Sequence, residues 1–421
     1  MERAILVGAP RKRSAARHLL TEHLEELARL ADTAGAEVVG EVTQLLDRPS
    51  PATYLGKGKL EELRHRVADI GATLVIFDDE LSPTQGKNIE LELGTRVMDR
   101  AELILDIFAT RARTSEAKMQ VELAQLEYML PRLARMWTHL EKTRGGIGLR
   151  GPGETQIETD RRLIRHRIKI LRERLEDVRR SREVQRAGRR DAFKVSLVGY
   201  TNAGKSSVLR SLASASDVFV EDRLFATLDP LTREVALGDH APALVTDTVG
   251  FIRKLPHDLV ASFRATLEEA ADADLLLHVI DASHPTWEEQ VAVVNEVLAE
   301  LKMAEKPVLH VFNKIDRLDG DELHALQERG REKVGEAIYV SAVAEGGLEP
   351  LRRALLGATR AKRPLMQVEI PVTDGRLLAE VHRSADVVDQ AQHDGVMVLR
   401  ARLDDATAGR LRGKGAKIRV Q

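Results

Sequence analysis

The sequence predicts an α/β protein of several domains, and three observations lead to that fold class. Short β-branched runs alternate with amphipathic helical stretches over residues 1–110 and again over residues 191–362, as in parallel sheets with helical crossovers. Between these regions, two charged segments carry apolar residues at heptad spacing. Residues 363–421 read as a small mixture of strands and helices. A chain of this length suffices for about two to four domains.

Composition narrows the class of protein. Hydrophobic residues make up 43% and charged residues 31% of the chain, and no apolar run reaches the length of a membrane span. The start, MERAILVGAPRKR, resembles a strand and a basic turn instead of a secretory signal, and the absence of cysteine excludes disulfides and thiolate metal sites. We expect a cytoplasmic protein, and nothing in the sequence demands more than a monomer.

Residues 1–110 predict an N-terminal parallel α/β domain. Its expected strands are the runs AILVG, AEVVGEV, TLVIFDD and LILDIF, separated by helical stretches such as AARHLLTEHLEELARLADTAG. The segment YLGKGKLEEL, around Lys57, has two interpretations: a second phosphate site, or a basic surface turn before a helix.

Residues 111–190 predict a long antiparallel helical hairpin. Apolar side chains repeat with steps of three and four residues along both of its segments, so the two stripes can face each other. A helix from about Ser115 to Lys142 spans roughly 40 Å, and Pro131 should kink it. The first stripe is Met119, Leu123, Leu126, Leu130, Leu133, Trp137 and Leu140, and the second is Ile164, Ile168, Leu171, Leu175 and Val178.

The stretch RGGIGLRGPGETQIETDRR, residues 144–162, has neither helical nor strand periodicity, and we expect residues 144–157 to form the tip of the hairpin. Its glycines allow close approach of the backbone to a partner, and its arginines favour an anionic partner such as RNA. The alternative is a solvated surface in which arginines pair with glutamates, as RERLEDVRR permits. The candidate RNA-binding residues are Arg144, Gly145, Gly146, Arg150, Gly151, Gly153, Gln156, Arg161 and Arg162.

Residues 191–362 predict a domain that binds a nucleoside triphosphate. The strand KVSLVG leads into GYTNAGKSS and a helix, so that backbone amides and the helix N-terminus can surround phosphate oxygens. Lys205 should reach the β- and γ-phosphates, and Ser206 should bind Mg²⁺. The whole expected loop is Gly199, Tyr200, Thr201, Asn202, Ala203, Gly204, Lys205, Ser206 and Ser207.

Three further motifs follow strand-like runs in the order that GTP-binding domains use: DTVGF, NKID and SAV. Asp316 can accept hydrogen bonds from guanine N1 and the exocyclic amine, donors that adenine lacks, so GTP is preferred over ATP. Asp247 should hold Mg²⁺ through water. The motifs add Asp247, Gly250, Asn313, Lys314, Asp316, Ser341, Ala342 and Val343 to the expected nucleotide site.

The catalytic expectations centre on Lys205, Thr227 and the amide of Gly250, which should sense the γ-phosphate. Thr227 is taken as the switch threonine that meets Mg²⁺, with Thr232 as the competing choice. Phe251 occupies the place of the water-orienting glutamine of Ras-like GTPases and cannot hydrogen-bond a water, so slow intrinsic GTP hydrolysis is expected. Asn202 resembles the asparagine with which some potassium-stimulated GTPases bind K⁺.

After a linker TRAKRP, residues 363–421 predict a small α+β domain. Its expected elements are QVEIPV, GRLLAEVHRS, GVMVLRARL, ATAGRLRG and AKIRV.

Several of these segments resemble a known family. The phosphate loop, LFATLDP, DTVGF and NKID are similar to the translation-factor-related P-loop GTPases of the Obg and HflX group. GPGETQIETDRR, YLGKGKLEEL, DDELSPTQ and DRAELILDIFATRARTSEAKMQVELAQLEYMLPRL resemble the HflX family itself. This resemblance covers residues 1–360 densely. It implies a ribosome-associated GTPase that binds the large ribosomal subunit and splits or rescues stalled or dormant ribosomes, notably under heat stress.

Two other functions stay open on the sequence alone. One is a GTP-dependent regulatory switch that docks a protein partner on the hairpin. The other is an RNA-remodelling NTPase whose N-terminal domain uses a nucleotide of its own.

Overall fold

The computed structural model describes residues 2–133, 152–187, 192–213, 224–238, 242–254 and 270–420. They fall into two compact units. The first unit holds the chain up to Ser181 together with the described residues 224–229 and 253–254, and the second unit holds the rest. None of the helices in these ranges combines the length and the apolar character that a bilayer crossing needs.

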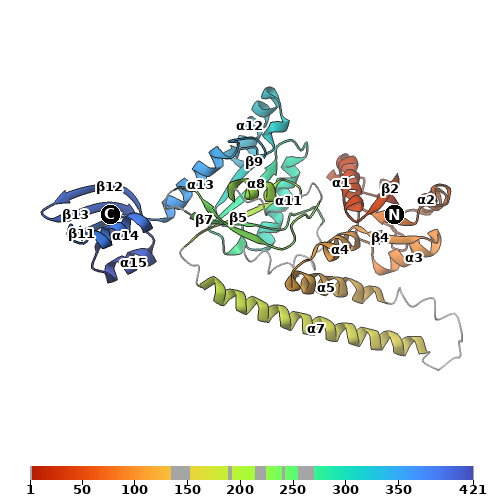
Figure 1. Ribbon diagram of the computed structural model, residues 1–421. Helices are drawn as coiled ribbons and strands as arrows, with labels where there is room; N and C mark the ends of the chain where they lie inside the picture. The colour runs from red at the N-terminus through yellow and green to blue at the C-terminus, as the bar shows by residue number, and fades with distance from the viewer. Residues whose placement is uncertain are drawn as a thin grey trace. The chain divides into compact units, whose positions relative to one another are not determined.

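The first unit begins with a four-stranded parallel sheet in the order β2-β1-β3-β4 (Figure 1). Its core includes Ile5, Leu63, Val75 and Ile89, all of them buried. The strands are β1 Glu2–Gly8, β2 Ala36–Thr43, β3 Leu74–Phe77 and β4 Arg96–Asp99. The helices of this region are η1 Ala15–Leu19, α1 Leu20–Thr33, α2 Lys57–Ile70, α3 Pro83–Leu93 and α4 Arg100–Arg111. The predicted N-terminal parallel sheet is confirmed.

One strand of this sheet was assigned wrongly from the sequence. LILDIF lies in α4, and the fourth strand is the shorter segment RVMD before it. The Asp99 side chain accepts a hydrogen bond from the Glu102 amide at 2.9 Å and so caps the helix. Leu103, Ile107 and Phe108 are buried at helical spacing. A short apolar run fits either structure, and the cap decides in favour of the helix.

The GKGK segment lies at the start of helix α2, where the second interpretation expected a basic segment before a helix. Lys57 begins α2, the Gly56 amide donates to Gln44 Oε1 at 3.2 Å, and Lys59 pairs with Glu62 at 2.8 Å. The Gly56 amide and the Lys59 ammonium group therefore have partners within the protein.

The first unit also contains α5 Ser115–Met129 and most of α7 Pro152–Ala187, which belongs to it up to Ser181. They lie side by side and run in opposite directions (Figure 1), and Leu123, Ile168 and Leu171 form their buried seam. The α-helix ends at Met129, and a 3₁₀ turn, η2 Leu130–Arg132, contains Pro131. This interruption at proline was predicted. The expected continuation to Lys142 lies mostly outside the described residues.

The predicted tip needs a correction at its C-terminal side. Helix α7 already begins at Pro152, so residues 152–162 are helical although their sequence suggested no regular structure. Proline suits the first position of a helix because its φ angle is preset and it lacks only a donor that would be unpaired there. Residues 144–151 lie outside the described residues.

The second unit contains a six-stranded mixed sheet in the order β10-β9-β8-β5-β7-β6, in which only β6 is antiparallel to its neighbour. Its strands are β5 Phe193–Gly199, β6 Leu231–Ala236, β7 Pro242–Asp247, β8 Leu275–Asp281, β9 Val308–Asn313 and β10 Ala337–Tyr339. Its helices are α8 Lys205–Ala213, α11 Trp287–Glu300, η3 Ile315–Arg317, α12 Gly320–Val334 and α13 Glu349–Lys362.

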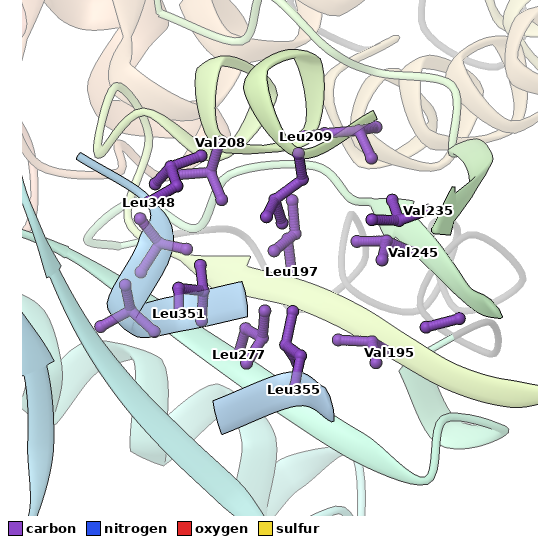
Figure 2. Packing of buried hydrophobic residues seen from close by; sticks show 14 of the residues in the cluster. Val195, Leu197, Val208, Leu209, Val235, Val245, Leu277, Leu348, Leu351 and Leu355 are labelled. Atoms are coloured by element: carbon purple, nitrogen blue, oxygen red, sulfur yellow. The ribbon is translucent and has the colours of Figure 1, made fainter. Parts of the chain in front are cut away.

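Helices cover both faces of this sheet, as predicted for a doubly wound domain. On one face, Val208 and Leu209 of α8 and Leu351 and Leu355 of α13 pack on Leu197, as Figure 2 shows. The opposite face packs against α11 and α12. Residues 359–362, predicted as linker, are the last turn of α13.

The C-terminal region forms a four-stranded antiparallel sheet in the order β12-β13-β11-β14. Two helices pack on one face of it around Val368, Val381 and Leu411, giving a β-α-β-β-α-β arrangement. The elements are β11 Leu365–Pro371, α14 Gly375–Ser384, β12 Asp386–His393, β13 Val396–Arg402, α15 Asp405–Gly413 and β14 Lys417–Val420. The α+β class is confirmed, but β12 was missed because DVVDQAQH is mostly polar.

Candidate nucleotide-binding site

The phosphate loop connects β5 to α8, where the sequence placed it. Gly204 has φ of 92°, and a Cβ at this position would lie 2.3 Å from Asn313 Nδ2, so only glycine fits. Asn202 also has a positive φ, 61°, and its carbonyl accepts from Lys314 Nζ at 2.8 Å. Asparagine tolerates this backbone conformation well, which gives Asn202 a local structural role.

Lys205 is the buried cation of the loop. Its ammonium group donates to the carbonyl oxygens of Gly199 at 3.1 Å and Tyr200 at 2.9 Å. Burial lowers the pKa of Lys205 to about 8, although the Asp247 carboxylate opposes that shift. A buried cation held by two neutral carbonyls is suited to an incoming phosphate, because the phosphate supplies the negative charge that the carbonyls lack.

The residues expected at Mg²⁺ lie together. Ser206 Oγ donates to Asp247 Oδ2 at 2.5 Å, and Asp247 is fully buried at the end of β7. A hydroxyl and a carboxylate are hard oxygen ligands of the kind that Mg²⁺ prefers, so this donor set fits the ion. Gly250 lies beside them: an added Cβ would be 2.6 Å from Thr201 Cα and 2.9 Å from Lys205 Nζ.

Phe251 has a structural role in the site. Its amide donates to the Gly199 carbonyl at 3.0 Å, and its carbonyl accepts from the Thr201 amide at 2.7 Å. The side chain is buried at 2% exposure and packs in the core beside Val198. The position that holds a water-orienting glutamine in Ras-like GTPases therefore joins the DTVGF segment to the phosphate loop.

Asn313 connects the NKID and SAV motifs, which are expected to bind the guanine base, to the phosphate loop. Its side-chain amide donates to the Ala203 carbonyl at 3.1 Å, and its Oδ1 accepts from the Ala342 amide at 3.0 Å. Ser341 Oγ donates to Asp316 Oδ1 at 2.5 Å and orients that carboxylate. Asn313 thus holds the phosphate loop and the SAV loop in one arrangement.

Asp281 is a member of this network that sequence reasoning missed. It ends β8, and its carboxylate accepts from Lys314 Nζ at 2.7 Å. Lys314 has φ of 68° and reaches both Asp281 and Asn202. The sequence contained a signal for Asp281, because in VIDAS an aspartate ends a strand-like run, as Asp247 does in VTDTV.

The two candidate switch threonines occupy different places. Thr232 lies in β6, and its hydroxyl shares a hydrogen bond of 2.8 Å with Thr246. Thr227 belongs to the first unit, whereas the phosphate loop belongs to the second. The choice of Thr227 as the switch residue stays a prediction.

Three protein families match successive regions of this chain. The family described as GTP-binding GTPase N-terminal matches residues 21–109, GTP-binding GTPase Middle Region matches residues 111–189, and 50S ribosome-binding GTPase matches residues 194–314. The GTPase HflX of Magnetococcus marinus is 48% identical over 416 residues, which cover 98% of this chain and 95% of the relative. The chain belongs to the HflX family of GTPases.

A second HflX relative agrees with this assignment. The GTPase HflX of Escherichia coli K12 is 45% identical over 385 residues, 91% of this chain and 90% of the relative. A crystal structure of a GTP-binding protein from the archaeon Sulfolobus solfataricus in complex with GDP is 27% identical, covering 85% of this chain and 99% of that chain, with a TM-score of 0.44. As an HflX-family protein, the chain is a P-loop GTPase with a GTPase domain of the ribosome-binding class.

The candidate RNA-binding residues are only partly described. Arg144, Gly145, Gly146, Arg150 and Gly151 lie outside the described residues, and Gly153 and Gln156 are placed only as part of the α7 backbone. Arg161 and Arg162 lie on α7, with Arg162 exposed.

Two arginines further along α7 follow the alternative interpretation. Arg167 pairs with Glu122 at 2.7 Å and Arg172 pairs with Glu127 at 2.6 Å, so these stem arginines join α7 to α5.

Proposed function

We propose that this GTPase binds the large ribosomal subunit through the α5–α7 hairpin and splits or rescues stalled or dormant ribosomes. The observation that carries the proposal is the packed seam of Leu123, Ile168 and Leu171, with the ion pairs beside it. Such packing gives a stiff support for the arginine- and glycine-rich segment of residues 144–157. A stiff support reduces the entropy lost when that segment is ordered on RNA.

At the nucleotide site, Ser206 and Thr227 would bind Mg²⁺ directly and Asp247 would bind it through water. The ion supplies charge neutralisation on the β- and γ-phosphates. Lys205 holds the same phosphates, the Gly250 amide detects the γ-phosphate, and Asp316 selects guanine. Asn202 is the candidate K⁺ contact. We propose that the protein acts as a cytoplasmic monomer.

Basal hydrolysis should be slow because Phe251 is fixed in the core and can orient no water. The ribosomal subunit would then accelerate turnover by completing or ordering the site. A regulatory switch with a protein partner is the second candidate, favoured by the glutamate pairing of Arg167 and Arg172, which leaves these two arginines less available to RNA.

GTP turnover by the purified protein, with and without isolated large ribosomal subunits, tests the proposal. The informative variant replaces residues 145–153 by a short unrelated loop. We expect the subunits to accelerate the wild type by orders of magnitude and the loop variant to keep its basal rate but lose the acceleration. An equal response of both proteins would contradict the role of the tip.

Salt separates the two candidate functions. Binding through several RNA phosphates should weaken steeply between 50 and 200 mM salt, by roughly 10³-fold or more for six phosphate contacts. Docking of a protein on apolar side chains at the hairpin surface should depend on salt only weakly. Arg161→Gln with Arg162→Gln should reduce the salt slope if these side chains contact phosphates, and Lys12→Ala, in the turn after β1, is the matched control.

A further inference from the structure

The two segments that should respond to GTP belong to the first unit, although they lie within the sequence of the GTPase domain. Residues 224–229 contain Thr227, and residues 253–254 follow Gly250 by three positions. Both segments group with the N-terminal sheet and its helices. Specific contacts of the described residues hold them there.

Residues 253–254 are held by a buried charge cluster. Arg100 of α4 is 1% exposed, donates from Nη1 to Asp78 Oδ1 at 2.9 Å, and also pairs with Glu26. Its Nε donates to the backbone carbonyl of Arg253 at 3.1 Å. One guanidinium group therefore connects two carboxylates of the N-terminal region to the chain just after DTVGF.

The two basic side chains of this segment complete the cluster. Lys254 Nζ lies 2.7 Å from Asp78 Oδ2 and 2.5 Å from Asp79 Oδ1, and Arg253 lies 3.5 Å from carboxylate oxygens of Glu26 and Asp78. We call these six residues the switch clamp: Glu26, Asp78, Asp79, Arg100, Arg253 and Lys254. Its formal charges balance, three positive and three negative.

The charges hold one another in the ionised form. Burial by itself would raise the pKa of Asp78, but Arg100, Lys254 and Arg253 outweigh burial and lower it below its ordinary value. Buried charges are stable only while they are paired, so moving Arg253 and Lys254 away would leave Asp78 with fewer partners at a substantial cost. The clamp therefore resists displacement of the segment.

Residues 224–229 are held in a different way. Phe225 is 2% exposed and packs edge-on against Phe108 of α4, with ring centroids 4.6 Å apart. Asp229 accepts from the amides of Arg113 and Thr114 at 3.3 Å and from the Thr114 hydroxyl. The segment is thus fastened on both sides of Thr227.

The position of Gly250 links these contacts to the nucleotide. Lys205 Nζ fills the space beside Gly250, since an added Cβ on this glycine would lie 2.9 Å from it. A γ-phosphate that contacts both groups needs Lys205 Nζ and Gly250 to move apart, by a shift of the lysine side chain, of the Gly250 backbone or of both. Arg253 is only three residues from Gly250, and extended chain spans at most about 3.6 Å per residue. The segment between them has little slack, so a shift of Gly250 also moves Arg253.

We propose that Asp78, Asp79 and Arg100 are positioning residues that act through Lys254 and Arg253 to disfavour the γ-phosphate, and so set the affinity for GTP relative to GDP. GDP has no γ-phosphate and leaves the clamp undisturbed. By linkage, whatever opens the clamp favours GTP binding, and GTP binding favours an open clamp. The inference rests on the proposed role of Gly250 and is independent of the ribosome.

The test measures the dissociation constants of GDP and of a non-hydrolysable GTP analogue for the full chain. The variants are Lys254→Met and Asp79→Asn, whose wild-type side chains are 36% and 22% exposed, so their loss should not prevent folding. We expect each variant to tighten analogue binding about fivefold, at the low end of usual coupling energies, with unchanged GDP affinity. Lys254→Arg should behave like the wild type.

The control is Lys12→Ala, which removes another pair with an aspartate, Lys12–Asp47 at 2.8 Å, outside the clamp. It should change neither affinity. An unchanged ratio in both clamp variants, or an equal change in both affinities, would overturn the inference. Gly250→Ala separates the two hypotheses: if it leaves analogue binding at the wild-type value, the proposed sensor role of Gly250 is wrong.

Discussion

Asn313→Ala gives a quantitative test of how the nucleotide site is assembled. The wild-type side chain is 2% exposed and makes two hydrogen bonds, to the Ala203 carbonyl at 3.1 Å and from the Ala342 amide at 3.0 Å. Alanine removes both partners and leaves two buried backbone groups unpaired. At about 1–1.5 kcal/mol per hydrogen bond, the loss is about 2–3 kcal/mol.

This energy should appear in nucleotide binding, because the two hydrogen bonds hold the phosphate loop and the SAV loop in place before the ligand arrives. A loss of about 2–3 kcal/mol corresponds to a roughly 30- to 150-fold weaker affinity for GDP. Fluorescence titration with labelled GDP measures it. The control is Asn88→Ala, which removes one exposed hydrogen bond to the Ala52 carbonyl, 2.9 Å long, outside the site. If both variants bind GDP within threefold of the wild type, Asn313 does not organise the site.

Three further predictions concern the second unit. Burial, together with His310 and Lys205, lowers the pKa of His278 to about 3. In the unfolded chain this histidine takes up a proton near pH 6.5, whereas in the folded chain it does not. The free energy of unfolding should therefore fall as the pH drops from 6.5 towards 3, by about 2 kcal/mol at pH 5. Denaturant unfolding at pH 7.5 and 5 measures this loss, and His278→Leu should lack it. Leu351→Ala, in the core of Figure 2, should cost about 2–5 kcal/mol in the same assay, with the half-exposed Leu45 as control site. Asp316→Asn should weaken GTP and GDP binding by at least about tenfold, since an amide cannot accept from both guanine donors, and equal affinity would remove Asp316 from base recognition.

The nucleotide motifs were readable from the sequence because their geometry is local. A strand, a glycine-rich turn and a helix start determine where Lys205 and Ser206 point, and the order of motifs fits a doubly wound sheet. These motifs meet at Asn313 because the parallel strands that precede them all end at the same edge of the sheet. Phe251 was singled out from its place after DTVG, but its role in joining DTVGF to Gly199 needed the backbone contacts.

The errors have identifiable physical causes. LILDIF was assigned to a strand because a short apolar run has no clear period, and the Asp99 cap settles it as a helix. Residues 152–157 were assigned to an irregular tip because Gly151, Pro152 and Gly153 lower the helical signal, although proline at the first position permits a helix. Strand β12 was missed because most of its side chains face water.

By itself, the sequence determined the class of each region, the order of the nucleotide motifs and the preference for guanine, because these depend on residue types at short, fixed spacing. Only the tertiary structure decided that Lys254 meets Asp78, a residue 176 positions away, and that Arg100 is buried between carboxylates. No local pattern predicts such pairs, since a charged residue in a sequence reads as a solvated one. Burial gives these charges their effect, and burial is a property of the packed chain.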